Sequence, residues 1–173
     1  SHLSGAINNV SQYSFALGAD IKGQIIDVPN SDPQKTPLSS IGTSDNPFKG
    51  KFNGNGYSIS TFEFTNAQGG GVGLFGVTSG ATLKNIHLDN ITIKQAIDPN
   101  TSLPENNVGA VVGLMQDGTL TNAIVTNSNI VGGDNTGGAV GAMVNSTAQE
   151  IFVGNNTTVN GGNNTGGLAG NLS

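Results

Sequence analysis

Short runs in which apolar and polar residues nearly alternate recur along the chain. Within residues 86–93, Ile86, Leu88, Ile91 and Ile93 are separated by polar residues, and asparagine or glycine bounds the run. Such runs predict short strands with one buried face, and the frequent β-branched residues favour the same structure. No segment has the 3.6-residue apolar period of a long amphipathic helix. The pattern therefore predicts an all-β protein.

A glycine-containing motif recurs at a nearly constant spacing. It is found at residues 107–113, 135–141 and 164–170, which follow one another at 28 and 29 residues, and residues 71–76 form a degenerate earlier copy. Periods of roughly 20 to 50 residues indicate repeat architectures, in which each unit buries its apolar face by stacking on its neighbours. The chain is therefore predicted to consist of stacked repeats.

A second motif lies between the copies of the first. Residues 82–93 match residues 119–130 position by position at an offset of 37, and residues 151–159 form a third copy with about one residue of slippage. Because the repeats contain strands rather than helices, each should climb onto the previous one in the same direction and pair with it in parallel. The repeats therefore predict a solenoid of parallel β-structure over residues 48–173.

Asparagines occupy equivalent positions in different repeats. Asn85 aligns with Asn122, and Asn90 aligns with Asn127 and, through the slipped copy, with Asn156. Stacked side-chain amides can hydrogen-bond to one another, and asparagine tolerates left-handed backbone angles. Two interpretations follow: an asparagine-lined corner, or ordinary turns that happen to contain asparagine.

The first part of the chain differs from the repeats. Four of the six prolines fall within residues 29–47, so this segment is predicted to form a long loop, whereas residues 13–26 are more strand-like. We expect residues 1–47 to form an N-terminal cap or first coil, because a bare solenoid edge is a template for further pairing. No cap is visible after the last glycine motif, so residues 48–173 are expected to belong to a longer protein.

With these motifs assembled, the sequence resembles the GLUG-motif repeat region of bacterial surface and secreted proteins. The resemblance begins at residues 15–21, becomes specific at residues 48–60 (FKGKFNGNGYSIS), and continues into residues 72–76 (VGLFG) and the later repeats. The family includes adhesins, haemagglutinin-like passengers and the non-catalytic part of IgA-peptidase-like proteins. The resemblance implies a right-handed parallel β-helix in an exported protein. It implies no catalytic residues, because the motif is a structural repeat.

Composition and charge exclude several classes of function. The 173 residues include 27 glycines and 23 asparagines but no cysteine, and the six cationic residues, all lysine, leave a formal net charge of −5. Without cysteine there can be no disulfide and no thiolate metal site. The chain also lacks the basic surface that nucleic-acid binding requires. No apolar run approaches the roughly 20 residues of a membrane-spanning helix.

Few residues are candidates for chemistry. His87 and Asp89 are two positions apart on one strand, so they form either a reactive or metal-binding pair or the solvent-facing half of an amphipathic strand. Asp117 and Asp134 lie at glycine-flanked turns, where oxygen ligands suit calcium, although residues 132–137 do not fit the calcium-binding β-roll repeat. We predict no catalytic, cofactor-binding or metal site, with calcium kept as the alternative to ordinary turns.

Aromatic residues are concentrated in the first repeats, at Phe48, Phe52, Tyr57, Phe62, Phe64 and Phe75. We expect these rings to fill the core rather than form a platform for sugars. Tyr57 is the ring best suited to remain exposed, because its hydroxyl can stay in water, and it is the candidate ligand-binding residue.

Together these features predict a non-enzymatic segment of an adhesin that is secreted or held at the bacterial cell surface. Its partner would be a host or cell-surface glycan or protein, bound through many weak contacts along a polar lateral face. Two alternatives remain open at this point: a structural stalk that only projects another region outward, and an accessory domain of a secreted peptidase.

Overall fold

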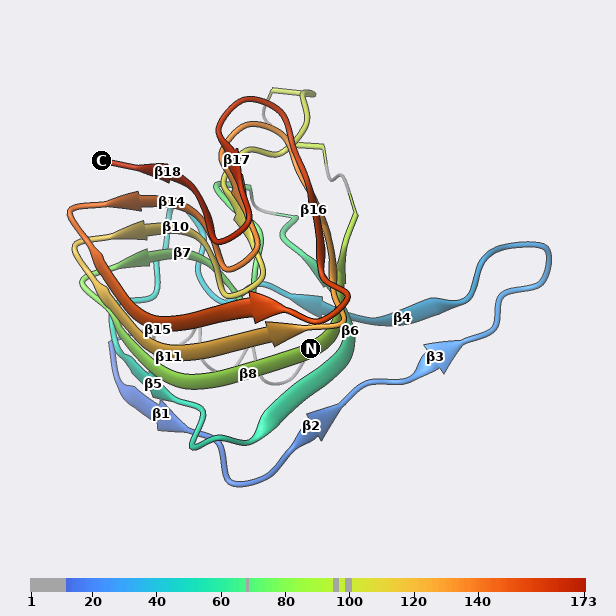
Figure 1. Ribbon diagram of the computed structural model, residues 1–173, viewed down its shortest axis with the longest axis horizontal. Helices are drawn as coiled ribbons and strands as arrows, with labels where there is room; N and C mark the ends of the chain where they lie inside the picture. The colour runs from blue at the N-terminus through green and yellow to red at the C-terminus, as the bar shows by residue number, and fades with distance from the viewer. Residues whose placement is uncertain (1–11, 68, 95–96, 99–100) are drawn as a thin grey trace.

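The computed structural model describes residues 12–67, 69–94, 97–98 and 101–173. All regular elements within these residues are strands, and they form three sheets (Figure 1). None of the described segments is a helix that could cross a membrane. Pairing between the strands is parallel except between β3 and β4. The predicted all-β class and parallel pairing are thus confirmed.

The largest sheet has eleven strands and contains the long strands of the repeats. Its members are β1 (Ser14–Ala16), β2 (Ile21–Lys22), β3 (Ile25–Ile26), β4 (Gln34–Ser39), β5 (Lys51–Asn53), β6 (Ser58–Thr65), β8 (Thr82–Ile93), β11 (Thr119–Thr126), β12 (Asn129–Val131), β15 (Thr147–Gly154) and β16 (Thr158–Asn160). β8 joins the two halves of this sheet, because it pairs with β5 and β6 on one side and with β11 and β12 on the other.

The glycine motifs build the two smaller sheets. One contains β7 (Phe75–Ser79), β10 (Val112–Gln116), β14 (Val140–Val144) and β18 (Ala169–Leu172), and the other contains β9 (Val108–Gly109), β13 (Thr136–Gly137) and β17 (Thr165–Gly166). Figure 1 shows β7, β10, β14 and β18 lying one above another, from green to red. Each of the three full copies of the motif therefore contributes one short strand to each of these sheets, whereas the degenerate first copy contributes β7 and only an isolated bridge from Val72 to Val108.

The register of the paired strands agrees with the spacing of the sequence repeats. β11 pairs with β8 at the predicted offset of 37 residues. β15 pairs with β11 at an offset of 28, whereas β16 pairs with β12 at 29. The extra residue lies between β15 and β16, where Asn155 and Asn156 adopt positive φ angles of 41° and 62°. The slippage is thus absorbed at a corner, where left-handed asparagines cost little.

Apolar side chains from the facing strands form one core. At its N-terminal end, Phe48, Phe52 and Phe75 are buried, with the ring centroids of Phe48 and Phe75 5.1 Å apart and those of Phe52 and Phe75 5.2 Å apart. Phe62 and Phe64 are also buried. The prediction that these rings fill the core is confirmed.

The loop expected over residues 29–47 is interrupted by strand β4, so this expectation is wrong for Gln34–Ser39. β4 pairs with β6 from Thr36 to Ser39, while β3 reaches only its first two residues. Proline is tolerated where a strand lies at the margin of a sheet, so Pro37 does not prevent pairing. Leu38 supplies the driving force, because it is buried in the core.

The N-terminal strands lie along one margin of the large sheet. β1 pairs with β5 and β2 pairs with β6, and the β3–β4 hairpin projects away from the stacked strands (Figure 1). Residues 1–11 of the expected cap lie outside the described residues. The division at residue 47 between a cap and the repeats stays a prediction.

Candidate functional site

His87 and Asp89 both lie half-buried on the outer side of β8. Asp89 Oδ1 accepts hydrogen bonds from Thr126 Oγ1 at 2.8 Å and from Asn127 Nδ2 at 2.7 Å. Burial raises the pKa of the Asp89 carboxyl, but the hydrogen bonds from Asn127 and Thr126, aided by electrostatic interactions with His87 and Lys35, lower this pKa below its ordinary value. Asp89 therefore helps to hold β11 on β8, which fits the solvent-facing half of an amphipathic strand.

Asp117 and Asp134 belong to different stacks of residues. Asp117 lies at the corner after β10 and accepts a hydrogen bond from Asn145 Nδ2 at 2.6 Å. Asp134 lies before β13 and bonds to residues of two other loops. Across the described residues, no three His, Asp or Glu side chains gather in a way that could hold a metal ion. Each carboxylate thus acts in a turn, and calcium at these positions stays untested.

Tyr57 is 39% exposed immediately before β6, which matches the expectation that its ring stays in contact with water. Its backbone N–H donates to Gly54 O at 3.0 Å, so it closes the tight turn after β5. It lies apart from the groove described next, and its role as a ligand-binding residue stays a prediction.

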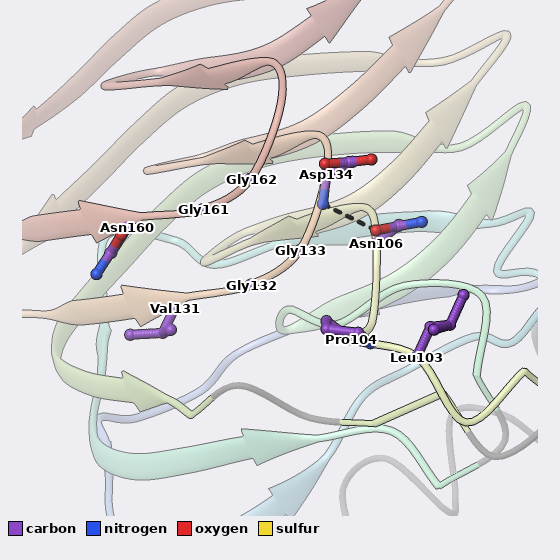
Figure 2. A pocket seen from close by; sticks show the side chains of 10 residues that line it. All are labelled: Leu103, Pro104, Asn106, Val131, Gly132, Gly133, Asp134, Asn160, Gly161 and Gly162. Carbon is purple, nitrogen blue, oxygen red and sulfur yellow. Dashed lines mark hydrogen bonds between the residues drawn. The ribbon is translucent and has the colours of Figure 1, made fainter.

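A groove with a volume of about 410 Å³ lies over three stacked loops (Figure 2). The lining consists of Leu103, Pro104 and Asn106 before β9, residues 131–134 from the end of β12 onward, and residues 160–162 from the end of β16 onward. The pairing of β9 with β13 and of β13 with β17 brings these segments together. We take this groove as the candidate functional site.

Two equivalent side chains, those of Asn106 and Asp134, hold the three loops in register. Asp134 N donates to Asn106 Oδ1 at 2.8 Å, and Asn163 N donates to Asp134 Oδ1 at 2.7 Å. Parallel backbone bonds accompany them, from Gly133 N to the carbonyl of Glu105 and from Gly162 N to the carbonyl of Gly133. Each position needs a side-chain oxygen, and asparagine serves as well as aspartate.

Glycine is required where the loops stack. A Cβ atom at Gly133 would lie 2.6 Å from Asn106 Oδ1, and one at Gly161 would lie 2.6 Å from Thr136 Cβ. A Cβ atom at Gly162 would meet the Asp134 carboxylate. Because no side chain fits here, peptide groups form part of the groove surface.

The rest of the lining combines polar and apolar side chains. Figure 2 shows the side chains of Asn106 and Asp134 extending in the same direction from neighbouring loops, whereas Asn160 and Val131 lie on the strands at the other end. Leu103 is 62% exposed beside Pro104. The groove therefore offers a carboxylate, amides and peptide groups for hydrogen bonding beside a small apolar surface.

A buried acid lies within one of these loops. Glu105 is only 3% exposed, between Pro104 and Asn106, which line the groove. Burial, and then the nearby Asp98 carboxylate, raise the pKa of Glu105 to about 7, although the backbone N–H of Gly70 donates to its carboxylate and opposes the shift. Glu105 thus titrates near neutral pH.

Of the groove residues, sequence reasoning singled out only Asp134 as a candidate. It missed Asn106, Asn160, Leu103 and the buried Glu105. One signal was available: residues 104–107 align with residues 132–135 and 161–164 when the repeats are superimposed. The alignment places Asn106, Asp134 and Asn163 at one position, but it does not show that their loops enclose a groove.

Comparison with known proteins finds a distant relative. The chain is 33% identical over 114 residues to a protein of Evansella cellulosilytica named "Putative Gly-rich membrane protein". The alignment covers 64% of this chain but only 13% of that protein, so the chain spans a small part of its relative. No protein-family model matches the chain, and no solved structure matches it.

Proposed function

We propose that the chain is part of a right-handed parallel β-helix in an exported bacterial protein, and that this segment binds glycans or proteins on host or other cell surfaces without catalysing a reaction. It would be secreted or held at the cell surface. The resemblance to GLUG-motif proteins supports both export and an adhesive role. The word "membrane" in the name of the Evansella relative agrees with a surface location.

The parallel pairing of successive repeats supports the right-handed helix. β8, β11 and β15 follow one another in the chain and pair in parallel, as do β7, β10, β14 and β18. Each connection leaves a sheet, passes through other strands and returns one layer further on. Such crossovers between parallel strands of one sheet are nearly always right-handed, because the twist of the strands favours that hand.

The single observation that carries the adhesive function is the repetition of polar side chains in register. Asn122 Nδ2 donates to Asn85 Oδ1 at 2.9 Å, and Asn85 Nδ2 donates to Asn53 Oδ1 at 3.0 Å. A second row links Asn164 to Asn135 at 3.0 Å. Neighbouring strands of a sheet are about 4.8 Å apart, so the same chemical groups recur at that interval along a side of the molecule. A ligand that makes a weak contact with each of these repeated groups is bound with raised avidity.

The proposal is tested by applying the purified chain to arrays of glycans and of extracellular-matrix proteins, with calcium and with a chelator. Saturable retention on either array supports adhesion, and its dependence on the chelator reports on calcium. The control is Leu88→Asp, which places a charge at a fully buried position and should abolish retention together with the β-sheet signal. If the folded chain is retained on neither array, the adhesive proposal is wrong and a stalk becomes the better interpretation.

A further inference from the structure

We propose that the groove binds a neutral glycan, with two neighbouring hydroxyl groups of one sugar ring held by Asp134 and Asn106. This inference rests on the proposed adhesive function and names the ligand class and the site. The volume of about 410 Å³ lies within the range of roughly 300–1,000 Å³ that is common for small-molecule sites.

The hydrogen-bonding groups of the groove match those of a sugar. Asp134 Oδ1 is occupied by Asn163 N–H, but Asp134 Oδ2 accepts no hydrogen bond from any residue that the structure describes. Asn106 Oδ1 is occupied by Asp134 N–H, while Asn106 Nδ2 donates to none of the described residues. An acceptor and a donor are thus left on adjacent side chains that extend the same way (Figure 2). A hydroxyl group both donates and accepts, so adjacent hydroxyls can satisfy both groups.

The charge of Asp134 is not needed for the turn. The equivalent positions in the previous and following repeats are Asn106 and Asn163, which present a side-chain oxygen without a charge. The carboxylate therefore adds a stronger acceptor than the fold requires. Hydrogen bonds to a charged acceptor are about twice as strong as those between neutral groups.

Charge and shape select the kind of glycan. None of the described residues that line the groove is a lysine, and the chain carries a formal net charge of −5, so acidic sugars would be repelled by Asp134. Exposed Leu103 and its neighbour Pro104 provide an apolar surface against which the C–H face of a pyranose ring can pack. The combination favours a neutral sugar over a uronic or sialic acid.

The test is a titration of the isotope-labelled full chain by NMR with lactose, maltotriose, mannotriose and chitotriose, and with sialyllactose as the acidic probe. At least one neutral sugar should cause saturable shifts of the amides of Leu103 and of residues 105–106, 132–134 and 160–163, and sialyllactose should cause none. Asp134→Asn should weaken binding at least tenfold without lowering the melting temperature. The matched control is Asp117→Asn, which removes the same charge outside the groove and should bind as the original chain does.

A second variant distinguishes a loss of binding from a change in the fold. Leu103 is exposed, so Leu103→Ala should leave stability unchanged while weakening binding severalfold. Binding of neutral sugars with unchanged affinity in both Asp134→Asn and Leu103→Ala overturns the assignment of the groove, and so does loss of binding in a chelator, because the contacts are direct. Retention on the protein array without a saturable shift by any of the four neutral sugars overturns this inference but leaves the adhesive function standing.

Discussion

At the scale of single residues, asparagine side chains join one repeat to the next. Asn85 and Asn122 have φ angles of 56° and 59°, a left-handed conformation that asparagine adopts more readily than most residues. Each amide also donates to the asparagine of the preceding layer, at 3.0 and 2.9 Å. Of the two interpretations drawn from the sequence, the asparagine-lined corner is therefore confirmed for Asn85 and Asn122, whereas the Asn127 amide donates to Asp89 and not to its aligned counterpart Asn90.

The next position in this row predicts a stabilising substitution. Glu150 follows Asn122 in the stack and has a φ of 57°. This left-handed backbone conformation costs about 1 kcal/mol, because it brings Cβ close to the following carbonyl oxygen. Glu150→Asn should relieve the strain and allow an amide bond to Asn122, raising the free energy of unfolding by about 1 kcal/mol. The measurement is urea denaturation. Glu150→Gln is the control, because it removes the charge and keeps the strain; equal midpoints for the two variants would contradict the argument.

Glu105 predicts a dependence of stability on pH. Its pKa is raised from an ordinary 4.5 to about 7 in the folded chain, so between these values the folded state binds more protons than the unfolded state. Stability contributed by this group should therefore fall as the pH rises from about 4.5 to about 7, and remain low above pH 7. Glu105→Gln should be more stable than the original chain at pH 8 and similar to it at pH 5.

Urea denaturation at both pH values measures this effect. Glu150→Gln serves again as the control, since it removes an exposed carboxylate of the same chemistry. A gain from Glu105→Gln that is the same at pH 5 and at pH 8 would show that the charge of Glu105 is not its cause.

Among the elements, the sequence predicted best those strands whose neighbours repeat the same pattern. The offset of 37 residues between the two copies of the strand motif is the register of β8 and β11, because identical patterns bury the same positions only in that alignment. Strand β4 was missed because the prolines of residues 29–47 favoured a loop, while burial of Leu38 decided its structure. Tertiary packing outweighed local preference there.

The groove could be predicted from the sequence only in part. The sequence identified Asp134, since a carboxylate between glycines is a local feature. It did not identify Leu103 or Asn160, because their proximity depends on how three loops stack, and Leu103 precedes the regular part of its repeat. Residues 103–106 and 131–134 differ in sequence, so only the positions that they share show that the two loops are equivalent.

Strand pairing predicts a gradient of hydrogen exchange across the large sheet. β11 pairs with β8 and β15, whereas β15 pairs with β11 alone among the described strands. Local opening should expose β15 more often, so its hydrogen-bonded amides should exchange at least tenfold faster than those of β11. Residue-resolved exchange measured by NMR tests this. Amides of the inner strand β8 provide the internal reference, and equal protection of β11 and β15 would contradict one-sided pairing as the cause.

Over the whole molecule, burial decreases toward the last layer of strands. Leu168 is 41% exposed, although its counterpart in the previous layer, Ala139, is fully buried. Leu172 is 69% exposed beside Met143 at 7%. These apolar side chains are exposed because no strand among the described residues lies on that side of β15–β18. In a stack of repeats, stability is approximately a sum of terms for each repeat and each interface between neighbours, so this side lacks one interface term.

A fused repeat should supply that term. Joining a second copy of residues 145–173 after Ser173 keeps the 29-residue spacing between β13 and β17 and places new strands over Leu168 and Leu172. Burying these side chains should raise the free energy of unfolding by about 2–4 kcal/mol and steepen the dependence on denaturant, since more surface is exposed on unfolding. Urea denaturation measures both. A fusion of equal length with aspartate at the new counterparts of Ile151 and Val153 should give no gain, because it cannot bury the core face of its own strand. A separate unfolding transition for the added copy, or an unchanged midpoint, would show that the exposed layer does not accept a repeat of its own kind.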